Sequence, residues 1–425
     1  MKERYSWESA AVLRDTPTGR RGQDRRCRHL VCVVHPVDVQ RIVVLGAGLA
    51  GARSVQELRA QGFTGEVVLL GAEPHLPYDR PPLSKQVLLG RADDSPIEVP
   101  WADLDVDLRL STAATALRPG TVTTTAGELS YDGLVLATGA RARLPEVLRG
   151  PDTHVLRTLD DALRLRAALV PGARVVVVGA GWIGAEVATA AAAAGCRTTV
   201  VEGAAGPLSS ALGAVGALTA PWYAAAGVEL RTCTPVDAVE PGAVLLAGGE
   251  RLQVDVVVVG VGATPDVDWL AGSGLELDRG VVVDEHLAAS WEGVVAVGDC
   301  AAWWSPRFGD RLRVEHWDDA LRAPAAAIAT LLGRPTLHDP VPYFWSEQLG
   351  HRVQYVGHAA CADAVVHRGQ AGGADGWAVG WLAGDRLVAL LAVDRPKDLA
   401  QARKRIGTVV DASRLADPAT QIKAV

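Results

Sequence analysis

The sequence contains no Cys-x-x-Cys pair, although it has six cysteines. Their spacing matches no zinc or iron–sulfur pattern, and no two histidines lie at the spacing of a ligand set. We therefore predict no metal site and interpret the cysteines as scattered thiols of a reducing cytoplasm. Cys300 has no partner thiol close by in the sequence, so we predict a structural role for it.

The sequence also lacks a strongly apolar run of about 18 residues, which a membrane-spanning helix would need. Its formal net charge is -7 at pH 7, which argues against nucleic acid or an anionic membrane as a partner. Residues 1–36 are rich in arginine and have no apolar core of a secretion signal. We predict a disordered tail there, or sequence upstream of a misplaced start codon; an interaction arm is the alternative.

What the sequence does contain is nearly the same phrase twice, as RIVVLGAGLAG at residues 41–51 and RVVVVGAGWIG at residues 174–184. Each phrase is a short apolar β-run followed by Gly-x-Gly-x-x-Gly. An alanine-rich helical stretch comes next, and Gly62 or Gly195 ends it as a C-terminal cap would. A second apolar β-run follows each helix, so the pattern predicts two βαβ dinucleotide-binding units.

Each part of this pattern has a physical task. The glycines permit a tight turn, a close approach of backbone to pyrophosphate, and close packing of helix on strand. The helix N-terminus offers unpaired N–H groups to the phosphates. An acidic residue after the second β-run binds ribose hydroxyls; Glu202 fits this position, and Glu73 lies one or two residues later than expected. We predict two working sites; a duplicated fold with one inactive site is the alternative.

Two dinucleotide sites on one chain indicate a flavin that exchanges electrons with a nicotinamide, here FAD and NADH. Glu202 would repel the 2′-phosphate of NADPH, and no Lys or Arg follows it before Arg231. The sequence therefore favours NADH over NADPH.

Four longer motifs carry a resemblance to a known family. They read LPYDRPPLSKQVLLG (76–90), VEHWDDA (314–320), YFWSEQLGHRVQYVG (343–357) and VALLAVDRPKDLAQARKRI (388–406). Together they resemble the single-component FAD-dependent ferredoxin reductases of the putidaredoxin reductase type, which serve bacterial cytochrome monooxygenases and ring-hydroxylating dioxygenases. Rubredoxin reductase and apoptosis-inducing factor share that fold. The resemblance covers nearly the whole chain after the arginine-rich segment.

The resemblance assigns residues to the two cofactors. It implies FAD contacts, in addition to the ribose ligand Glu73, at Gly46, Gly48, Ala50, Gly51, Arg80, Lys85, Ala114, Thr138, Gly139, Arg157, Asp299 and Trp317. On the NAD side it implies, beside Glu202, Gly179, Gly181, Ile183, Gly184, Glu186 and Gly262. The catalytic set that it implies is Lys85, Glu186 and Trp345.

Each catalytic assignment has a plainer alternative. Lys85 could be an ordinary exposed lysine, Glu186 could complement a helix dipole, and Trp345 could be core. This chain also departs from the family pattern at two positions. Ala72 stands where family members often have an acid, so ribose binding would shift to Glu73. Trp182 lies inside the second glycine loop, where it either stacks near the nicotinamide or packs.

We expect an α/β fold with two Rossmann-like domains of the glutathione reductase kind and a C-terminal α+β interface domain. The FAD domain would comprise residues 37–150 and 266–338, the NAD domain 151–265, and the C-terminal domain 339–425. The apolar runs of residues 377–393, around AGDR, predict a hairpin there.

The implied activity is hydride uptake from NADH and single-electron transfer to an acidic iron–sulfur ferredoxin, in a cytoplasmic monomer or weak dimer. Arg307, Arg311 and Arg313 are the basic candidates for that contact. A disulfide reductase or NADH oxidase would need a cysteine in PPLSKQ, which has none. A rubredoxin acceptor, or a slow signalling flavoprotein of the apoptosis-inducing-factor type, stays open.

Overall fold

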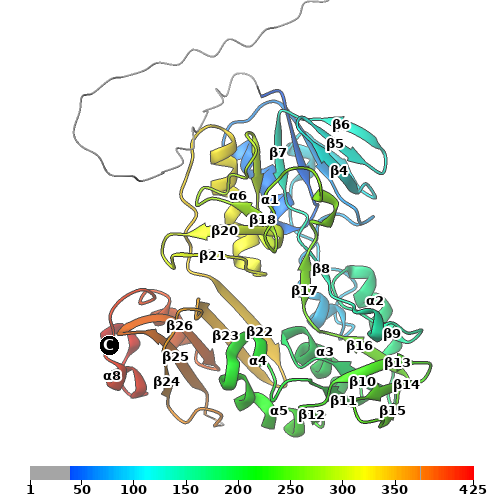
Figure 1. The fold of residues 1–425 in the computed structure, drawn as a ribbon, viewed down its shortest axis with the longest axis vertical. Helices are drawn as coiled ribbons and strands as arrows, with labels where there is room; N and C mark the ends of the chain where they lie inside the picture. The colour runs from blue at the N-terminus through cyan, green and yellow to red at the C-terminus, as the bar shows by residue number, and fades with distance from the viewer. Residues whose placement is uncertain (1–38, 374) are drawn as a thin grey trace, which may run out of the picture. The chain divides into compact units, whose positions relative to one another are not determined.

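The computed structural model describes residues 39–373 and 375–425, and the structural statements below concern those residues (Figure 1). The arginine-rich segment 1–36, for which we predict a tail, lies outside the described residues, as do Cys27 and Cys32.

The first glycine phrase opens a five-stranded parallel sheet with the strand order β19-β7-β1-β2-β3. Its strands are β1 (Arg41–Leu45), β2 (Glu66–Leu70), β3 (Val106–Arg109), β7 (Gly133–Leu136) and β19 (Val294–Ala296). Near-continuous valine and leucine in β1, β2 and β7 suit a sheet that is covered on both faces, whereas the edge strand β3 alternates apolar and charged residues. Helix α1 (Leu49–Ala60) follows β1, and α6 (Trp317–Leu331) packs along α1.

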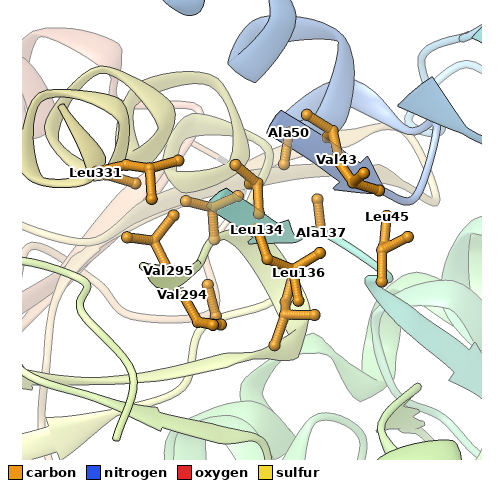
Figure 2. Packing of buried hydrophobic residues seen from close by; sticks show 14 of the residues in the cluster. Val43, Leu45, Ala50, Leu134, Leu136, Ala137, Val294, Val295 and Leu331 are labelled. Carbon is orange, nitrogen blue, oxygen red and sulfur yellow. The ribbon is translucent and has the colours of Figure 1, made fainter. Parts of the chain in front are cut away.

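The core of this unit lies between the sheet and these two helices. Figure 2 shows the packed side chains, labelled Val43, Leu45, Ala50, Leu134, Leu136, Ala137, Val294, Val295 and Leu331. Each fully buried Val or Leu contributes about 1.5–3 kcal/mol relative to an exposed one. The rigid sheet therefore fixes where the loops at its carboxyl edge begin.

The second glycine phrase opens another parallel sheet, of order β12-β11-β10-β16-β9. Its strands are β9 (Thr153–His154), β10 (Arg174–Val178), β11 (Arg197–Val201), β12 (Glu229–Arg231) and β16 (Val256–Val259). Its helices are α2 (Leu159–Ala168), α3 (Trp182–Ala193), α4 (Ser209–Leu212) and α5 (Ala220–Ala225). Gly62 and Gly195, one residue past the C-caps of α1 and α3, have positive φ, as the helix-end prediction requires.

The chain passes between the two sheets on a pair of antiparallel strands, β8 (Ala140–Ala142) and β17 (Ala263–Pro265). It leaves the first sheet after β7 and returns to it as β19, so the second unit interrupts the first. Three small sheets, two antiparallel and one mixed, flank these units. They contain β4 (Ala114–Arg118), β5 (Thr121–Thr124) and β6 (Gly127–Ser130); β13 (Val236–Glu240), β14 (Ala243–Leu246) and β15 (Arg251–Gln253); and β21 (Asp310–Leu312) with the parallel pair β18 (Val281–Val283) and β20 (Ala301–Ser305).

The last part of the chain forms a five-stranded antiparallel sheet of order β22-β23-β26-β25-β24. Its strands are β22 (Tyr343–Gln348), β23 (His351–Gly357), β24 (Ala364–Arg368), β25 (Trp377–Ala383) and β26 (Arg386–Val393), followed by α7 (Pro396–Ala402) and α8 (Ala412–Ala416). The predicted hairpin is β25–β26. Two Rossmann-like units and this sheet confirm the predicted fold class. No helix in the described ranges is long and apolar enough to cross a bilayer.

Candidate active site

The outer glycines of both turns, which are the first and third of each motif, are required by the packing of the protein itself. An added Cβ at Gly46, where φ is +109°, would lie 2.1 Å from the Ala137 carbonyl oxygen. At Gly179 it would lie 2.6 Å from the Gly260 oxygen. The third glycines are tighter still, because a Cβ would meet the first glycine's carbonyl oxygen at 1.8 Å in Gly51 and 2.0 Å in the equivalent Gly184.

The middle glycines, Gly48 and Gly181, are different. Their φ angles of -85° and -77° suit any residue. The nearest protein atom to an added Cβ is the flexible Arg80 Nη1 at 3.2 Å for Gly48 and the Gly260 oxygen at 3.8 Å for Gly181. Each caps a helix without a side-chain hydrogen bond. The protein alone does not require these glycines, whereas a pyrophosphate at the helix N-terminus does, so the residues fit the two cofactors.

The two predicted ribose ligands are held differently. Glu202 directly follows β11 and accepts hydrogen bonds from the backbone N–H of Ala180 at 2.7 Å and of Ala204 at 2.8 Å. Its carboxylate therefore holds the second glycine turn directly.

Glu73, by contrast, is bound by side chains of its own loop. It accepts from the Tyr78 hydroxyl at 2.5 Å and from Arg80 Nη2 at 2.8 Å. Burial is the main cause that raises the pKa of Tyr78, so its hydroxyl stays a donor. Arg80 links Glu73 to the first turn, since its other terminal nitrogen lies beside Gly48.

Several predicted residues meet at the carboxyl edge of the first sheet, around the crossing strands. Arg157 donates from Nη2 to Asp299 at 2.7 Å and from Nε to the Ala140 carbonyl at 2.8 Å. The Thr138 hydroxyl donates to the Asp266 carbonyl at 2.8 Å. Gly139 and Gly262 have positive φ, of +71° and +107°, where each crossing strand begins. Because parallel strands end at one edge, residues far apart in the sequence converge here.

Lys85 and Glu186 form a buried ion pair with Nζ and Oε2 2.9 Å apart. Lys85 lies in a short π-helical segment, Leu83–Val87, and Glu186 in α3, so the pair joins the first unit to the second. Their side chains are only 14% and 5% exposed. Burial and pairing argue against the plainer alternatives of an exposed lysine and a helix-dipole acid, because a buried charge needs a specific partner.

The Glu186 carboxylate also accepts hydrogen bonds from two serines that the sequence did not single out. Ser84 donates to Oε2, and Ser346 donates to Oε1 at 2.6 Å. Both serines lie inside the motifs PPLSK and FWSEQ, so those motifs held the signal. Their meeting at one carboxylate depends on tertiary structure.

Strand β22, which carries Ser346, also brings together two groups of aromatic side chains. Trp345 lies edge-on to Trp317, with ring centroids 5.9 Å apart, and stacks on Tyr343 at 6.1 Å. Trp317 Nε1 donates to Asp79 at 2.9 Å. Trp182 packs edge-on against Phe344 with centroids 4.5 Å apart, which is compatible with both of its predicted roles.

The remaining predicted residues lie at the margins of the two turns. Ala50 is buried in the first turn of α1, and Ile183 is 41% exposed in the first turn of α3. Ala114 begins β4, in a small antiparallel sheet outside the glycine turn. Cys300 is fully buried, and burial raises its thiol pKa, as a structural thiol requires.

The three arginines proposed for partner contact are engaged within the chain. Arg307 lies 3.7 Å from the Asp339 carboxylate, and Arg313 lies 2.5 Å from Glu315. Arg311 donates to the backbone carbonyls of Val283 and Ala302. Sequence shows a cluster of charge here but not these intramolecular partners.

Comparison with known proteins gives matches over nearly the whole described chain. Residues 40–323 match the family of pyridine nucleotide-disulphide oxidoreductases, and residues 343–425 match a reductase C-terminal domain. The ferredoxin reductase component of chlorobenzene dioxygenase from Cupriavidus sp. (strain PS12) is 37% identical, covering 88% of this chain and 95% of the relative.

Solved structures are similar over the same extent. The crystal structure of Fdr9 is 50% identical, with a TM-score of 0.86, covering 90% of this chain and 99% of that one. The covalent complex of putidaredoxin reductase with putidaredoxin gives 33% identity and a TM-score of 0.86, covering 90% and 97%.

Proposed function

The chain belongs to the pyridine nucleotide-disulphide oxidoreductase family, and from this premise we propose that it is an FAD-containing ferredoxin–NAD(+) reductase. It takes hydride from NADH and passes single electrons to a small iron–sulfur ferredoxin that serves a cytochrome monooxygenase or a ring-hydroxylating dioxygenase. The observation that carries the proposal is the buried Lys85–Glu186 pair, whose lysine lies in the segment where a disulfide reductase would need a cysteine. The named relatives, a dioxygenase reductase component and a putidaredoxin complex, support this acceptor class.

The residues present divide the work between two nucleotide sites. FAD, when bound, supplies the chemistry that joins a two-electron hydride step to one-electron steps. The turn Gly46–Gly51, with Arg80, Thr138, Gly139, Arg157 and Asp299, would hold it. The turn Gly179–Gly184, with Glu202, would hold NADH.

Between these sites the chain supplies charge and shelter from water. Lys85 places a fixed positive charge where a reduced group gains negative charge, and such preorganised charges act strongly away from water. Glu186 fixes the ammonium in place at 2.9 Å. Trp317 and Trp345, whose rings meet edge-on, would shelter the site from water when FAD is bound.

The electrostatics around Glu202 support NADH as the donor. A carboxylate that holds the turn repels a 2′-phosphate. Arg231, the first cation that follows Glu202 in the sequence, pairs with Glu229 at 2.8 Å and Glu250 at 2.7 Å. It is therefore already neutralised by two carboxylates of its own domain.

We also propose a domain organisation, an oligomeric state and a cellular location. The proposal keeps the domain boundaries 37–150 with 266–338, 151–265, and 339–425. It includes a cytoplasmic monomer or weak dimer, with neither nucleic acid nor a membrane as partner. The four cysteines of the described part, Cys196, Cys233, Cys300 and Cys361, are free thiols, which suits a reducing compartment.

The decisive experiment is anaerobic mixing of the purified flavoprotein with NADH and, separately, with NADPH. The flavin band near roughly 450 nm reports the hydride step. We expect rapid bleaching by NADH and slow bleaching by NADPH, followed by cytochrome c reduction that depends on added ferredoxin. A rubredoxin in place of ferredoxin tests the alternative acceptor. Slow bleaching with a long-lived charge-transfer band would support the signalling alternative instead, and a protein that refuses FAD would refute the proposal.

A further inference from the structure

Strand β22 of the C-terminal sheet presents alternate residues to the two nucleotide units. Tyr343 and Trp345 lie on the face that meets Trp317 of α6. Phe344 and Ser346 lie on the face that meets α3. This alternation follows from the two-residue period of a strand.

Three residues of helix α3 contact this strand and the turn that follows it. Trp182 packs on Phe344, Glu186 accepts from Ser346, and Thr189 Oγ1 accepts the Leu349 N–H at 2.8 Å. The spacing of four and then three residues places these side chains on one helix face. The C-terminal sheet thus contacts the helix that carries Glu186 at three successive points.

The hydrogen bond between Ser346 and Glu186 differs from the other two contacts because its acceptor is a buried carboxylate. Ser346 is 1% exposed, and its single hydroxyl proton goes to Glu186 Oε1 at 2.6 Å. Gln348 Nε2 lies 3.4 Å from the same serine oxygen and fixes the direction of the hydroxyl. On the other carboxylate oxygen lie Lys85 Nζ and Ser84.

The donors to Glu186 therefore come from two directions. Lys85 and Ser84 belong to the first unit, and Ser346 belongs to the C-terminal sheet. A carboxylate with donors on only one oxygen can rotate about its terminal bond or withdraw, whereas donors on both oxygens fix its plane. Ser346 is the group that completes this restraint.

We propose that Ser346 is a positioning residue for the hydride step: it fixes the Glu186 carboxylate, and through it the Lys85 ammonium. The inference rests on the proposed function and assigns the C-terminal sheet a part in tuning the flavin site. Loss of the hydroxyl leaves Glu186 Oε1 without its serine donor, so the carboxylate can turn about the contacts that Lys85 and Ser84 make with Oε2 and shift its charge. The negative charge at that place is then weakened, as it is when Glu186 is replaced by glutamine.

The test compares S346A with three other variants in the FAD-loaded protein. We expect S346A to slow flavin reduction at saturating NADH about tenfold, because a hydrogen bond to a charged group is lost. The dissociation constant for NADH stays unchanged. S346T, which keeps the hydroxyl, restores the rate.

T189V is the matched control, because it also cuts a hydrogen bond between α3 and the C-terminal sheet but leaves Glu186 untouched. We expect it to keep the wild-type rate. In an E186Q background, S346A should have little further effect, since the serine acts through that carboxylate. A full tenfold effect in the E186Q background would overturn the inference.

A second readout needs no turnover. The flavin midpoint potential, measured by dye equilibration, should shift to more positive values in E186Q and by a smaller amount in S346A. It should stay at the wild-type value in T189V and S346T. If S346A does not fold, S346C carries the same predictions, because a thiol is a weak donor of similar size. Wild-type rate and potential in S346A would refute the positioning role, whereas failure of the wild-type protein to be reduced by NADH would refute the proposed function itself.

Discussion

The two glycine turns are nearly identical in sequence, yet they differ in how an acidic residue supports them. In the second unit, Glu202 holds the turn itself through the N–H of Ala180. In the first, Ala72 follows the strand closely, and Glu73 is turned toward Tyr78 and Arg80. The comparison shows that the backbone geometry of the motif and its ligand-binding acid are separable features. The first and third glycines of each turn are fixed by packing, whereas the acidic residue is free to vary.

The largest effects should come from the outer glycines, and they should be unequal between the turns. G46A forces a Cβ to within 2.1 Å of a backbone oxygen, and G179A to within 2.6 Å. Both residues have positive φ, so strain adds to the clash. We expect G46A to lower the free energy of unfolding of the apoprotein by about 4 kcal/mol and G179A by somewhat less, as measured in urea. Equal losses would show that the two turns relax alike.

The middle glycines should separate ligand binding from stability. G48A and G181A place a methyl group where the protein has room, so we expect apoprotein stability to change by less than about 1 kcal/mol. A methyl group against the pyrophosphate should nevertheless weaken binding about 100-fold, of FAD in G48A and of NADH in G181A. Fluorescence titration with each nucleotide measures both constants. A crossed result, with G48A impairing only NADH, would reverse the assignment of the two sites.

Removal of Glu202 should sharpen the comparison on the NAD side. E202A removes the acceptor of two backbone N–H groups, and we expect NADH to bind about 20-fold more weakly. NADPH should not lose affinity, because the repulsion of its 2′-phosphate disappears with the carboxylate. The ratio of the two dissociation constants is the measurement.

E240Q is the control for this prediction. Glu240 is an acidic residue of the same unit, and among the described residues its one salt-bridge partner is Arg251 on β15 of the same small sheet. Its removal should leave both nucleotide affinities unchanged. Parallel losses of NADH and NADPH in E202A would mean that Glu202 serves the loop and not specificity.

The sequence predicts these turns well because their signals are local. A strand, three glycines and a helix lie within a few residues, and the helix-ending Gly62 and Gly195 have the expected positive φ. The contact between Ser346 and Glu186 joins positions 160 residues apart, and no periodic pattern links them. Trp182 and Phe344 also pack together although they are far apart in the sequence. Motif resemblance pointed to both segments, but only packing of α3 on β22 shows that they meet.

The arginines proposed for partner contact give a second example of interactions that depend on tertiary structure. Arg307 and Arg313 are evident as charges in the sequence, but each has an acidic partner within the chain. The partner of Arg307, Asp339, lies beyond α6, so the sequence cannot show that it neutralises the arginine. Net charge is readable from composition, whereas the potential of a surface depends on which charges are paired.

We predict the smallest effect for A72D, which gives the first turn an acidic residue close to the end of its strand. A72D places a carboxylate two residues after the end of β2, one position later than Glu202 stands after β11, while Glu73 keeps its partners. We expect FAD to bind about fivefold more tightly to the apoprotein, since ribose hydroxyls gain a charged acceptor. A72N, of the same shape but uncharged, should gain less, and fluorescence titration compares the two. If A72D binds FAD no better than the wild-type protein, Glu73 already serves the ribose despite its bonds to Tyr78 and Arg80, and the two turns are alike in function although they differ in geometry.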